Sequence, residues 1–345
     1  MKLGLQLGYW GAQPPADAVE KIQEAERLGF DIVFTAESWG SDAFTPLAWW
    51  GAQTSRIRLG TSIVQISART PAATAMHALT LDHLCGGRHV LGLGVSGPQV
   101  VEGWYGQPFG KPLARTREYV DIVRQALRRE GPVTNDGPHY PLPFTGDNSL
   151  GLGKALKPIT HPLRGDLPIW LGAEGPKNVA LSAEIADGWL PIYYSPKVAE
   201  MYNGWLEDGF ARRDGGRRPD TFEIASNCTV VVTDDVDATL DAMKPTLGFY
   251  IGGMGARDMN FHKQVFARMG YEKEADEIQD LFFEGEREKA IAAVPRQMAA
   301  DISLVGPAAK IRDDLGMWDD AGVTMLVIGA RNVDEMRKVA EVILG

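Results

Sequence analysis

The chain has 345 residues, of which 44% are hydrophobic, and a formal net charge of −10 at pH 7. This apolar content is enough for a full hydrophobic core, and the acidic balance argues against a nucleic acid or an anionic membrane as partner. The first residues lead directly into a strand pattern instead of a signal peptide, and no apolar run approaches the roughly 20 residues of a membrane span. The length suits two ordinary domains or one α/β barrel with insertions.

The cysteines and histidines form no pattern typical of a metal site. Cys85 and Cys228 are far apart in the sequence and lack CxxC spacing, and the six histidines include no HxxxH-type pair. We therefore expect two buried free thiols, no bound metal and a cytoplasmic location, where the environment is reducing.

Strand and helix patterns alternate through the first 128 residues. Short apolar or alternating runs predict strands, and apolar positions spaced three and four residues apart predict helices. The expected strands are 3–7, 31–34, 57–64 and 89–95, and the expected helices are 18–28, 44–52, 72–84 and 113–128.

The same alternation resumes at residue 167, but two segments interrupt it. Residues 131–166 are rich in Gly, Pro and Asn, and we expect a loop insertion that lies over the functional site. Residues 244–300 are predicted to be a second, mostly helical insertion. The expected strands are 169–171, 189–192, 222–232 and 323–328, with helices at 179–186 and 196–213 and others starting near 235, 307 and 332.

Eight strands with intervening helices predict an α/β fold, a closed parallel (β/α)8 TIM barrel that forms one domain over residues 1–345. A doubly wound open sheet is the alternative. That fold usually carries a GxGxxG fingerprint after its first strand, and residues 8–11, Gly-Tyr-Trp-Gly, do not match it.

The turn after the strand at 169–171 has the composition of an anion-binding site. Gly172 and Gly175 permit a sharp, uncovered turn, and Pro176 suits the first turn of a helix. The amides from Gly175 to Asn178 should then point outward from the helix start, where the helix dipole favours an anion and Lys177 adds a positive charge. We predict a phosphate or phosphodiester clamp, although an ordinary strand-to-helix turn would need the same Gly and Pro residues.

The expected active face, at the carboxyl ends of the strands, is aromatic and poor in charge. Glu37 is its main carboxylate, and it could contact a bound ring or substrate, or bind the backbone amides of its own loop. Tyr9, Trp10 and Trp39 are candidates for the walls of a substrate pocket, with plain loop packing as the alternative. Because no Ser-His-Asp set, Schiff-base lysine or acid pair is present, this face suits a large cofactor that brings its own reactivity.

Three stretches, in order and at barrel spacing, resemble the bacterial luciferase-like superfamily, in particular its branch that uses coenzyme F420, a deazaflavin. They are residues 59–64 with 69–72, residues 88–94, and residues 169–189. The resemblance covers nearly the whole chain. It implies an enzyme that transfers a hydride between the deazaflavin and an unidentified small organic substrate, and a homodimer by analogy with relatives.

The resemblance also implies positions for the cofactor. The Ser62–Ile63 peptide should be cis and press against the central ring, residues 95–97 should line the ring edge, and Glu37 should lie near the ring as a candidate catalytic residue. Residues 173–178 should hold the phosphodiester. The implied cofactor-binding residues are Glu37, Ser62, Ile63, Gly94, Val95, Ser96, Gly97, Gly172, Ala173, Glu174, Gly175, Pro176, Lys177, Asn178 and Ile192.

The sequence departs from two branches of the family. Ser38 stands where the sugar-phosphate dehydrogenases have a histidine. That branch also has a glutamate after the glycines of its fourth strand, where this chain has residues 95–98, Val-Ser-Gly-Pro, and Gln6 stands at about the place of a glutamate of the methylenetetrahydromethanopterin reductases. Without the acid–base pair of alcohol oxidation, we expect hydride delivery to an activated C=C, C=O or C=N bond. The alternatives are an FMN-dependent luciferase-like monooxygenase and a non-catalytic deazaflavin carrier.

Overall fold

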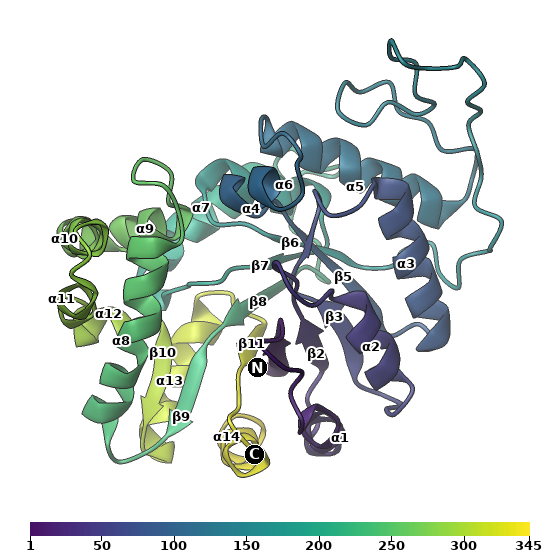
Figure 1. The fold of residues 1–345 in the computed structure, drawn as a ribbon. Coiled ribbons are helices and arrows are strands. Elements are labelled where there is room, and N and C mark those ends of the chain that lie inside the picture. The colour runs from purple at the N-terminus through teal and green to yellow at the C-terminus, as the bar shows by residue number, and fades with distance from the viewer.

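The computed structural model describes residues 1–345, and its centre is a closed barrel of eight parallel strands (Figure 1). The pairing of β3 with β5 and that of β11 with β1 complete the ring, which confirms the predicted TIM barrel. The barrel strands are β1 (Lys2–Gly8), β2 (Ile32–Thr35), β3 (Arg58–Thr61), β5 (His89–Gly94), β6 (Ile169–Gly172), β7 (Gly188–Leu190), β8 (Glu223–Asn227) and β11 (Met325–Ile328).

Helices form the outer layer of the barrel. Figure 1 looks approximately along the barrel axis, so that α1 and α14 are seen end on. None of the helices combines the length and the apolar content that crossing a bilayer requires. The outer helices are α1 (Ala18–Leu28), α2 (Phe44–Gly51), α3 (Pro71–Leu84), α5 (Pro112–Arg128), α6 (Pro176–Ile185), α7 (Ala199–Phe210), α13 (Ala308–Asp320) and α14 (Val333–Leu344), with the short 3-10 helix η1 (Pro196–Val198) before α7.

Two short elements near β5 were not predicted. Strand β4 (Val64–Gln65) pairs with the end of β5, and helix α4 (Pro98–Gly103) follows β5. Two and six residues are too few for a hydrophobic period to be recognised.

Large side chains fill the barrel interior at positions where neighbouring strands carry glycine. Phe34 and Trp170 are fully buried, with ring centroids 5.9 Å apart. A Cβ atom at Gly60 would lie 2.5 Å from the Phe34 ring, and one at Gly188 would lie 2.7 Å from the Trp170 ring. The two glycines therefore provide the space that these aromatic rings occupy.

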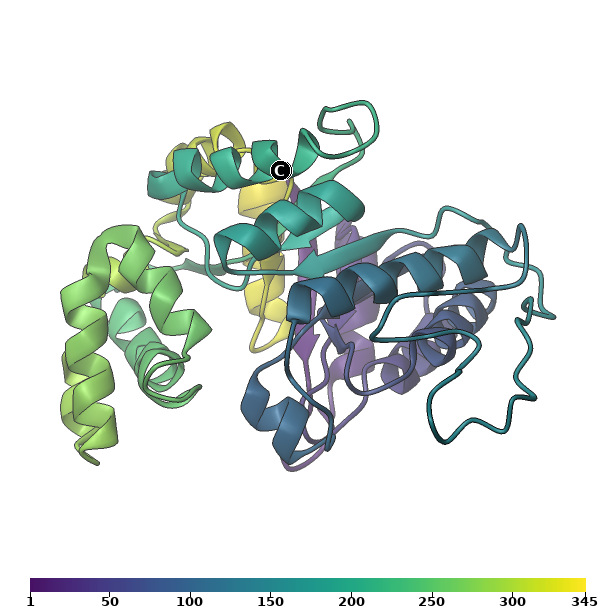
Figure 2. The same ribbon diagram turned by 90° about the horizontal axis from the view of Figure 1, so that it is seen from above.

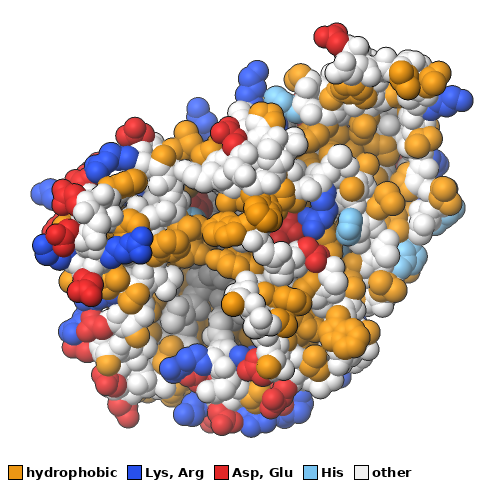
Figure 3. Space-filling model, in the orientation of Figure 1, with side chains coloured by type: hydrophobic (Ala, Val, Ile, Leu, Met, Phe, Trp, Pro, Cys, Tyr) orange, Lys and Arg blue, Asp and Glu red, His pale blue; other side chains and the backbone are white.

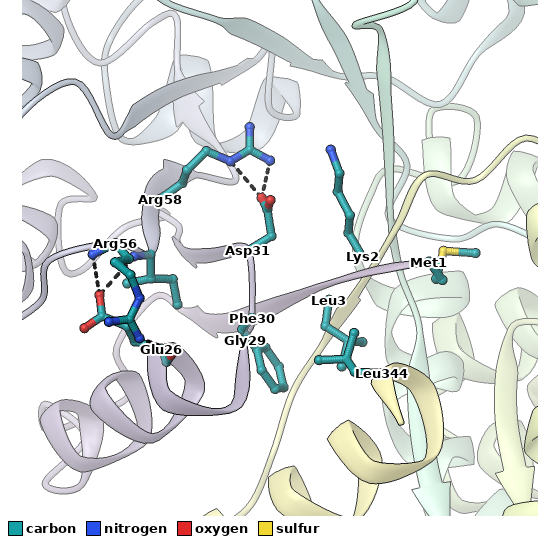
Figure 4. Close-up of a pocket in the computed structure, with 11 residues that line it drawn as sticks. Met1, Lys2, Leu3, Glu26, Gly29, Phe30, Asp31, Arg56, Arg58 and Leu344 are labelled. Atoms are coloured by element: carbon teal, nitrogen blue, oxygen red, sulfur yellow. Dashed lines mark hydrogen bonds and ion pairs between the residues drawn. The ribbon is translucent and has the colours of Figure 1, made fainter.

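Charged side chains surround the amino-terminal end of the barrel (Figure 4). Arg58 forms an ion pair with Asp31 and lies 5.3 Å from the centre of the Trp170 ring, and Lys2 Nζ is 2.5 Å from Glu223 Oε1. Lys2, Asp31 and Arg58 are among the residues that line a pocket of about 410 Å³. Because TIM-barrel enzymes place their chemistry at the opposite end, we assign this end to stability.

Between β8 and β11 the chain leaves the barrel and forms a separate unit of helices and two strands. Strand β9 (Thr229–Val232) pairs in parallel with β10 (Ser303–Gly306) outside the barrel. The single strand predicted at 222–232 is therefore wrong, because its two halves belong to different sheets, and β10 was not predicted. The helices of this unit are α8 (Val236–Gly253), α9 (Phe261–Phe266), η2 (Ala267–Tyr271), α10 (Glu272–Phe283), α11 (Arg287–Ala292) and α12 (Arg296–Ala300).

The long connection between α5 and β6 contains no helix or strand apart from one isolated bridge. It starts at the end of a helix and finishes at the start of a strand, and it lies at the outer edge beside α3 and α5 (Figures 1 and 2). Arg164 Nη2 is 2.8 Å from Asp82 Oδ1 on α3, and Arg129 Nε donates to the Pro158 carbonyl oxygen. Asn135 Nδ2 and the His139 amide donate to Glu118 Oε2 in the first half of α5, so the segment also runs back along this helix. The expectation that residues 131–166 lie over the functional site is wrong, because the segment lies at the outer edge of the helix layer and not over the strand ends.

His89, the first residue of β5, makes stability depend on pH. It is fully buried, its Nδ1 is 2.8 Å from the Leu59 carbonyl oxygen, and its Nε2 has no partner. Burial lowers the pKa of His89 to about 4, because the charged ring would lose its hydration. The unfolded chain therefore binds more protons than the folded one between pH 6.5 and 4, so His89 reduces stability as the pH falls through this range.

We expect His89→Gln to flatten the pH dependence of the free energy of unfolding between pH 6.5 and 4. The wild-type slope from this one group is at most about 1.4 kcal/mol per pH unit. Urea unfolding at a series of pH values measures it for both proteins. Parallel curves for the variant and the wild type would contradict this account.

Candidate active site

The carboxyl ends of the barrel strands open onto the face seen in Figures 1 and 3. Figure 3 shows a hollow in this face, with hydrophobic side chains along its upper edge and charged side chains mostly at the margins of the molecule. The predicted site residues follow β1, β2, β3, β5, β6 and β7, so their backbones all lie at this end of the barrel.

Ile63 lies against the last residues of two neighbouring strands. The Ser62–Ile63 peptide is cis, as the resemblance implied. A Cβ atom at Gly94 would lie 2.8 Å from Ile63 Cγ1, and one at Gly172 would lie 3.0 Å from Ile63 Cγ2. Because larger residues at these two positions would displace Ile63, the glycines and Ile63 together form a compact apolar floor at the barrel mouth.

The loop after β5 leaves this floor in an unusual conformation. Val95, Ser96 and Gly97 are each partly exposed, and Ser96 has a φ of 60°, a left-handed conformation that is uncommon outside glycine. Further along the same connection, the Phe109 ring stacks on Phe261 of α9 with a centroid distance of 6.3 Å. The β5–α5 connection and the helical insertion therefore meet on this side of the molecule.

Glu37 forms a buried ion pair. Its side chain is 3% exposed, and Arg69 Nη1 donates to both of its oxygens at 2.8 and 2.9 Å. Glu37 Oε1 also accepts the backbone amide of Gln65 at 2.9 Å. Both carboxylate oxygens of Glu37 therefore accept hydrogen bonds from the protein. The bond to the Gln65 amide agrees with the alternative that Glu37 binds backbone amides near its own loop. A catalytic role for Glu37 stays a prediction.

Arg69 is held in place by several groups besides Glu37. Its guanidinium lies 5.3 Å from the centre of the Phe44 ring, and its carbonyl oxygen accepts the Tyr119 hydroxyl at 3.1 Å. Burial alone would lower the pKa of Arg69, but the hydrogen bond and charge of Glu37 outweigh it and raise this pKa. Arg69 therefore stays charged, and its bonds to Glu37 fix the loop after β2 to the segment after β4.

The turn after β6 is held by a side chain of the next strand. Trp189 Nε1 donates to the Ala173 carbonyl oxygen at 2.8 Å, and both residues are buried. The tryptophan at the end of the 169–189 stretch therefore has a structural role, because its hydrogen bond fixes the backbone that leads into α6.

The start of α6 has the features of an anion site, with one difference from the prediction. Pro176 is the first helical residue, Lys177 is exposed, and the amides of Gly175 and Lys177 donate to no group of the protein. The amide of Asn178 instead donates to the Gly175 carbonyl oxygen at 3.0 Å. Fewer amides than expected are therefore free to bind an anion, because the Asn178 amide is already hydrogen-bonded within the first turn of α6.

Glu174, in the same turn, lies beside a histidine that the sequence did not single out. Glu174 Oε1 is 2.8 Å from His262 Nδ1, and Glu174 Oε2 is buried without a partner. His262 belongs to α9, and its ring lies edge-on to Tyr250, at 4.9 Å, and to Tyr193, at 6.0 Å. No spacing rule connects residues 174 and 262, so this cluster could be found only from the fold.

The tyrosines of this cluster remain protonated near neutral pH. Burial raises the pKa of Tyr193 well above its usual value. Burial, followed by the neighbouring Tyr9, raises the pKa of Tyr250 to about 12. Both phenols can therefore donate a hydrogen bond at this rim.

The aromatic residues after β1 and β2 lie near one another. The Trp10 amide donates to Ser41 Oγ at 2.9 Å, while Trp10 Nε1 is buried and has no partner. Tyr9 and Trp39 are about half exposed. Ile192, which follows β7, is partly buried. The unpartnered indole N–H of Trp10 and the accessible rings of Tyr9 and Trp39 are features of a pocket wall, and this role for the three residues stays a prediction.

Comparison with known proteins agrees with the family that the sequence motifs resemble. The sequence model of the family described as luciferase-like monooxygenase matches residues 3–325. A Mycobacterium tuberculosis protein named as a coenzyme F420-dependent oxidoreductase is 61% identical over 343 residues, which cover 99% of each chain. The 5,10-methylenetetrahydromethanopterin reductase of Archaeoglobus fulgidus is 28% identical over 323 residues, 93% of this chain and 92% of that one.

A solved structure supports the same fold. The coenzyme F420-dependent tetrahydromethanopterin reductase of Methanopyrus kandleri superposes with a TM-score of 0.80 at 23% sequence identity, covering 99% of this chain and 98% of that one. The family match extends over nearly the whole barrel, from β1 to the first residue of β11. The chain therefore belongs to the luciferase-like monooxygenase family.

Proposed function

We propose that this protein is a coenzyme F420-dependent oxidoreductase that transfers a hydride between the deazaflavin and a small organic substrate. The observation that carries the proposal is the 61% identity, over 99% of both chains, to the M. tuberculosis protein named for that cofactor. FMN is the less favoured alternative, because this relative is named for coenzyme F420.

The residues at the barrel mouth fit a flat ring with an anionic tail. Ile63, supported by Gly94 and Gly172, offers an apolar surface for the ring. The free amides of Gly175 and Lys177, at the positive end of α6, offer donors for the phosphodiester. The bound coenzyme supplies the hydride chemistry, and the protein holds and orients it.

We assign Glu37 a positioning role within this site. Its buried contacts to Arg69 and to the Gln65 amide fix the backbone that follows Ile63, and both carboxylate oxygens already accept hydrogen bonds. The reaction that remains easiest is hydride delivery from reduced coenzyme to a polarised C=O, C=C or C=N bond.

Anaerobic turnover of reduced F420 with a panel of ketones, enones and imines tests this function. We expect the absorbance of the oxidised coenzyme to recover with at least one class of substrate. In parallel, the protein is mixed with reduced FMN and oxygen. Oxygen uptake with FMN and no turnover with F420 would support the monooxygenase alternative, and tight F420 binding without any turnover would support a carrier.

We also propose that the protein is a cytoplasmic homodimer. Large apolar side chains are exposed on α2 and α3, including Trp49 and Met76, and on the peripheral segment, where Ile159 is 94% exposed. The two free, buried cysteines suit a reducing compartment. Sedimentation equilibrium at the mass of one chain, 37.6 kDa, would contradict the dimer.

A further inference from the structure

The helical insertion brings acid–base groups to a rim whose own strands provide few. Glu37 is occupied by Arg69, and the loops after β2 and β5 carry no histidine. Helices α8 and α9 instead place Tyr250 and His262 beside Glu174 and Tyr193, which follow β6 and β7. The insertion therefore completes the chemistry of the barrel mouth as well as its shape.

The backbone holds Glu174 in a fixed position beside the imidazole. The residue before it, Ala173, is anchored by Trp189, and the residue after it, Gly175, begins the cap of α6. Glu174 Oε1 lies 2.8 Å from His262 Nδ1, although the angles between the two groups do not make a hydrogen bond in this structure. Acid–base hydrogen bonds in unliganded enzymes are often poorly aligned and tighten when the substrate binds.

Of the groups that contact the His262 ring, the Glu174 carboxylate is the charged one. Tyr193 and Tyr250 pack against the ring, and Tyr9 adjoins Tyr250. On its own helix, Lys263 Nζ is turned toward Asp276 Oδ1 at 2.7 Å and Gln279 Oε1 at 2.7 Å. A carboxylate at Nδ1 favours a proton on that nitrogen and leaves Nε2 for a second partner, an arrangement that is common in acid–base catalysis.

We propose that His262, positioned by Glu174, is the catalytic proton donor and acceptor of this enzyme, and that the substrate is a carbonyl compound or the corresponding alcohol. The inference rests on the proposed function. In the direction of reduction, the coenzyme held at this barrel mouth would supply a hydride for the carbonyl carbon, and the π electron pair of the C=O bond would pass to the oxygen. The doubly protonated ring of His262 gives its Nε2 proton to that oxygen, so an O–H bond forms and the N–H bond breaks. The neutral ring that remains then regains a proton on Nε2 from solvent. The other ring proton stays on Nδ1, beside the Glu174 carboxylate, throughout. In the direction of oxidation, Nε2 of the neutral ring accepts the hydroxyl proton.

Tyr193 and Tyr250, which pack against the His262 ring, are better placed to donate hydrogen bonds than to act as a base. Because Tyr250 has a pKa of about 12, its phenol loses its proton too rarely near neutral pH to act as the base. As protonated donors, Tyr193 and Tyr250 can instead hold the substrate oxygen beside His262.

The first test compares His262→Gln with His161→Gln, a matched change at an exposed histidine of the peripheral segment. With a carbonyl substrate, we expect His262→Gln to lower kcat by roughly 100-fold or more, the size typical of general acid–base catalysis. Binding of oxidised F420 should change by less than about threefold, because a general acid acts on the proton transferred in the transition state and not on the bound coenzyme. The control should retain wild-type values, and Glu174→Gln should change the pH profile of kcat.

The second test does not depend on turnover. In protein labelled with ¹⁵N-histidine, the signal that disappears in His262→Gln identifies His262. We expect its neutral ring to carry the proton on Nδ1 in the wild type, and Glu174→Leu to move that proton toward Nε2.

The two proposals fail in different ways. If the wild type turns over F420 and His262→Gln is equally active, the proton-donor assignment is overturned while the proposed function stands. If the wild type neither binds nor turns over F420, the proposed function fails. A ring protonated on Nε2, or one unchanged by Glu174→Leu, overturns the His262–Glu174 assignment whether or not the coenzyme binds.

Discussion

Replacing Glu37 with glutamine is expected to lower the free energy of unfolding by about 3–5 kcal/mol, the usual cost of removing one partner of a buried ion pair. The Glu37 side chain is 3% exposed and that of Arg69 is 18% exposed, so water cannot replace the lost charge effectively. The variant would leave the Arg69 guanidinium beside a neutral amide. The midpoint of urea unfolding measures the change.

Two further variants give this experiment its controls. In the double variant Glu37→Leu/Arg69→Met no charge stays buried, so part of the lost stability should return. Asp237→Asn breaks an exposed pair with Arg296, in which both side chains are about half exposed or more, and should have a much smaller effect. A Glu37→Gln protein as stable as the wild type but without turnover would contradict the positioning role and favour a catalytic one.

The second large effect is expected on coenzyme binding. Gly175→Asp places a negative charge at the start of α6, and the variant should bind oxidised F420 about 1–3 kcal/mol more weakly because it repels the phosphodiester. This corresponds to a dissociation constant that is about 5- to 150-fold higher. Isothermal titration calorimetry with the two proteins at the same ionic strength measures the difference.

Gly175→Asn is the matched control because asparagine has nearly the same shape without the charge. A Cβ atom at Gly175 would meet no atom within 4 Å, and the φ of −91° suits any residue, so both variants should fold. If Gly175→Asp and Gly175→Asn bind F420 equally well, the phosphodiester does not lie at this turn.

The barrel could be predicted because its signals are local. Each strand is a short apolar run, and features such as Gly29, which ends α1 with a φ of 91°, mark where helices stop. The turn at Gly172, Gly175 and Pro176 was predicted for the same reason, since its glycines and proline define the backbone within a few residues. The cis peptide at Ser62 came from the family resemblance, because nothing in a Ser-Ile pair requires it.

The errors concern which parts of the chain meet in space. The apolar run at 222–232 continues across Cys228, and no local pattern shows that β9 leaves the barrel to pair with β10. The segment 131–166 has the composition of an active-site loop, but it packs at the outer edge beside α3 and α5, which no local pattern shows. The Glu174–His262 pair was missed because its members are joined only through the packing of the insertion.

Titration of oxidised coenzyme F420 into the wild-type protein decides whether this barrel binds a deazaflavin. We expect saturable binding in the micromolar range or tighter, with FMN a weaker competitor for the same site. Absence of saturable F420 binding, or clear displacement of F420 by equimolar FMN, would contradict this expectation.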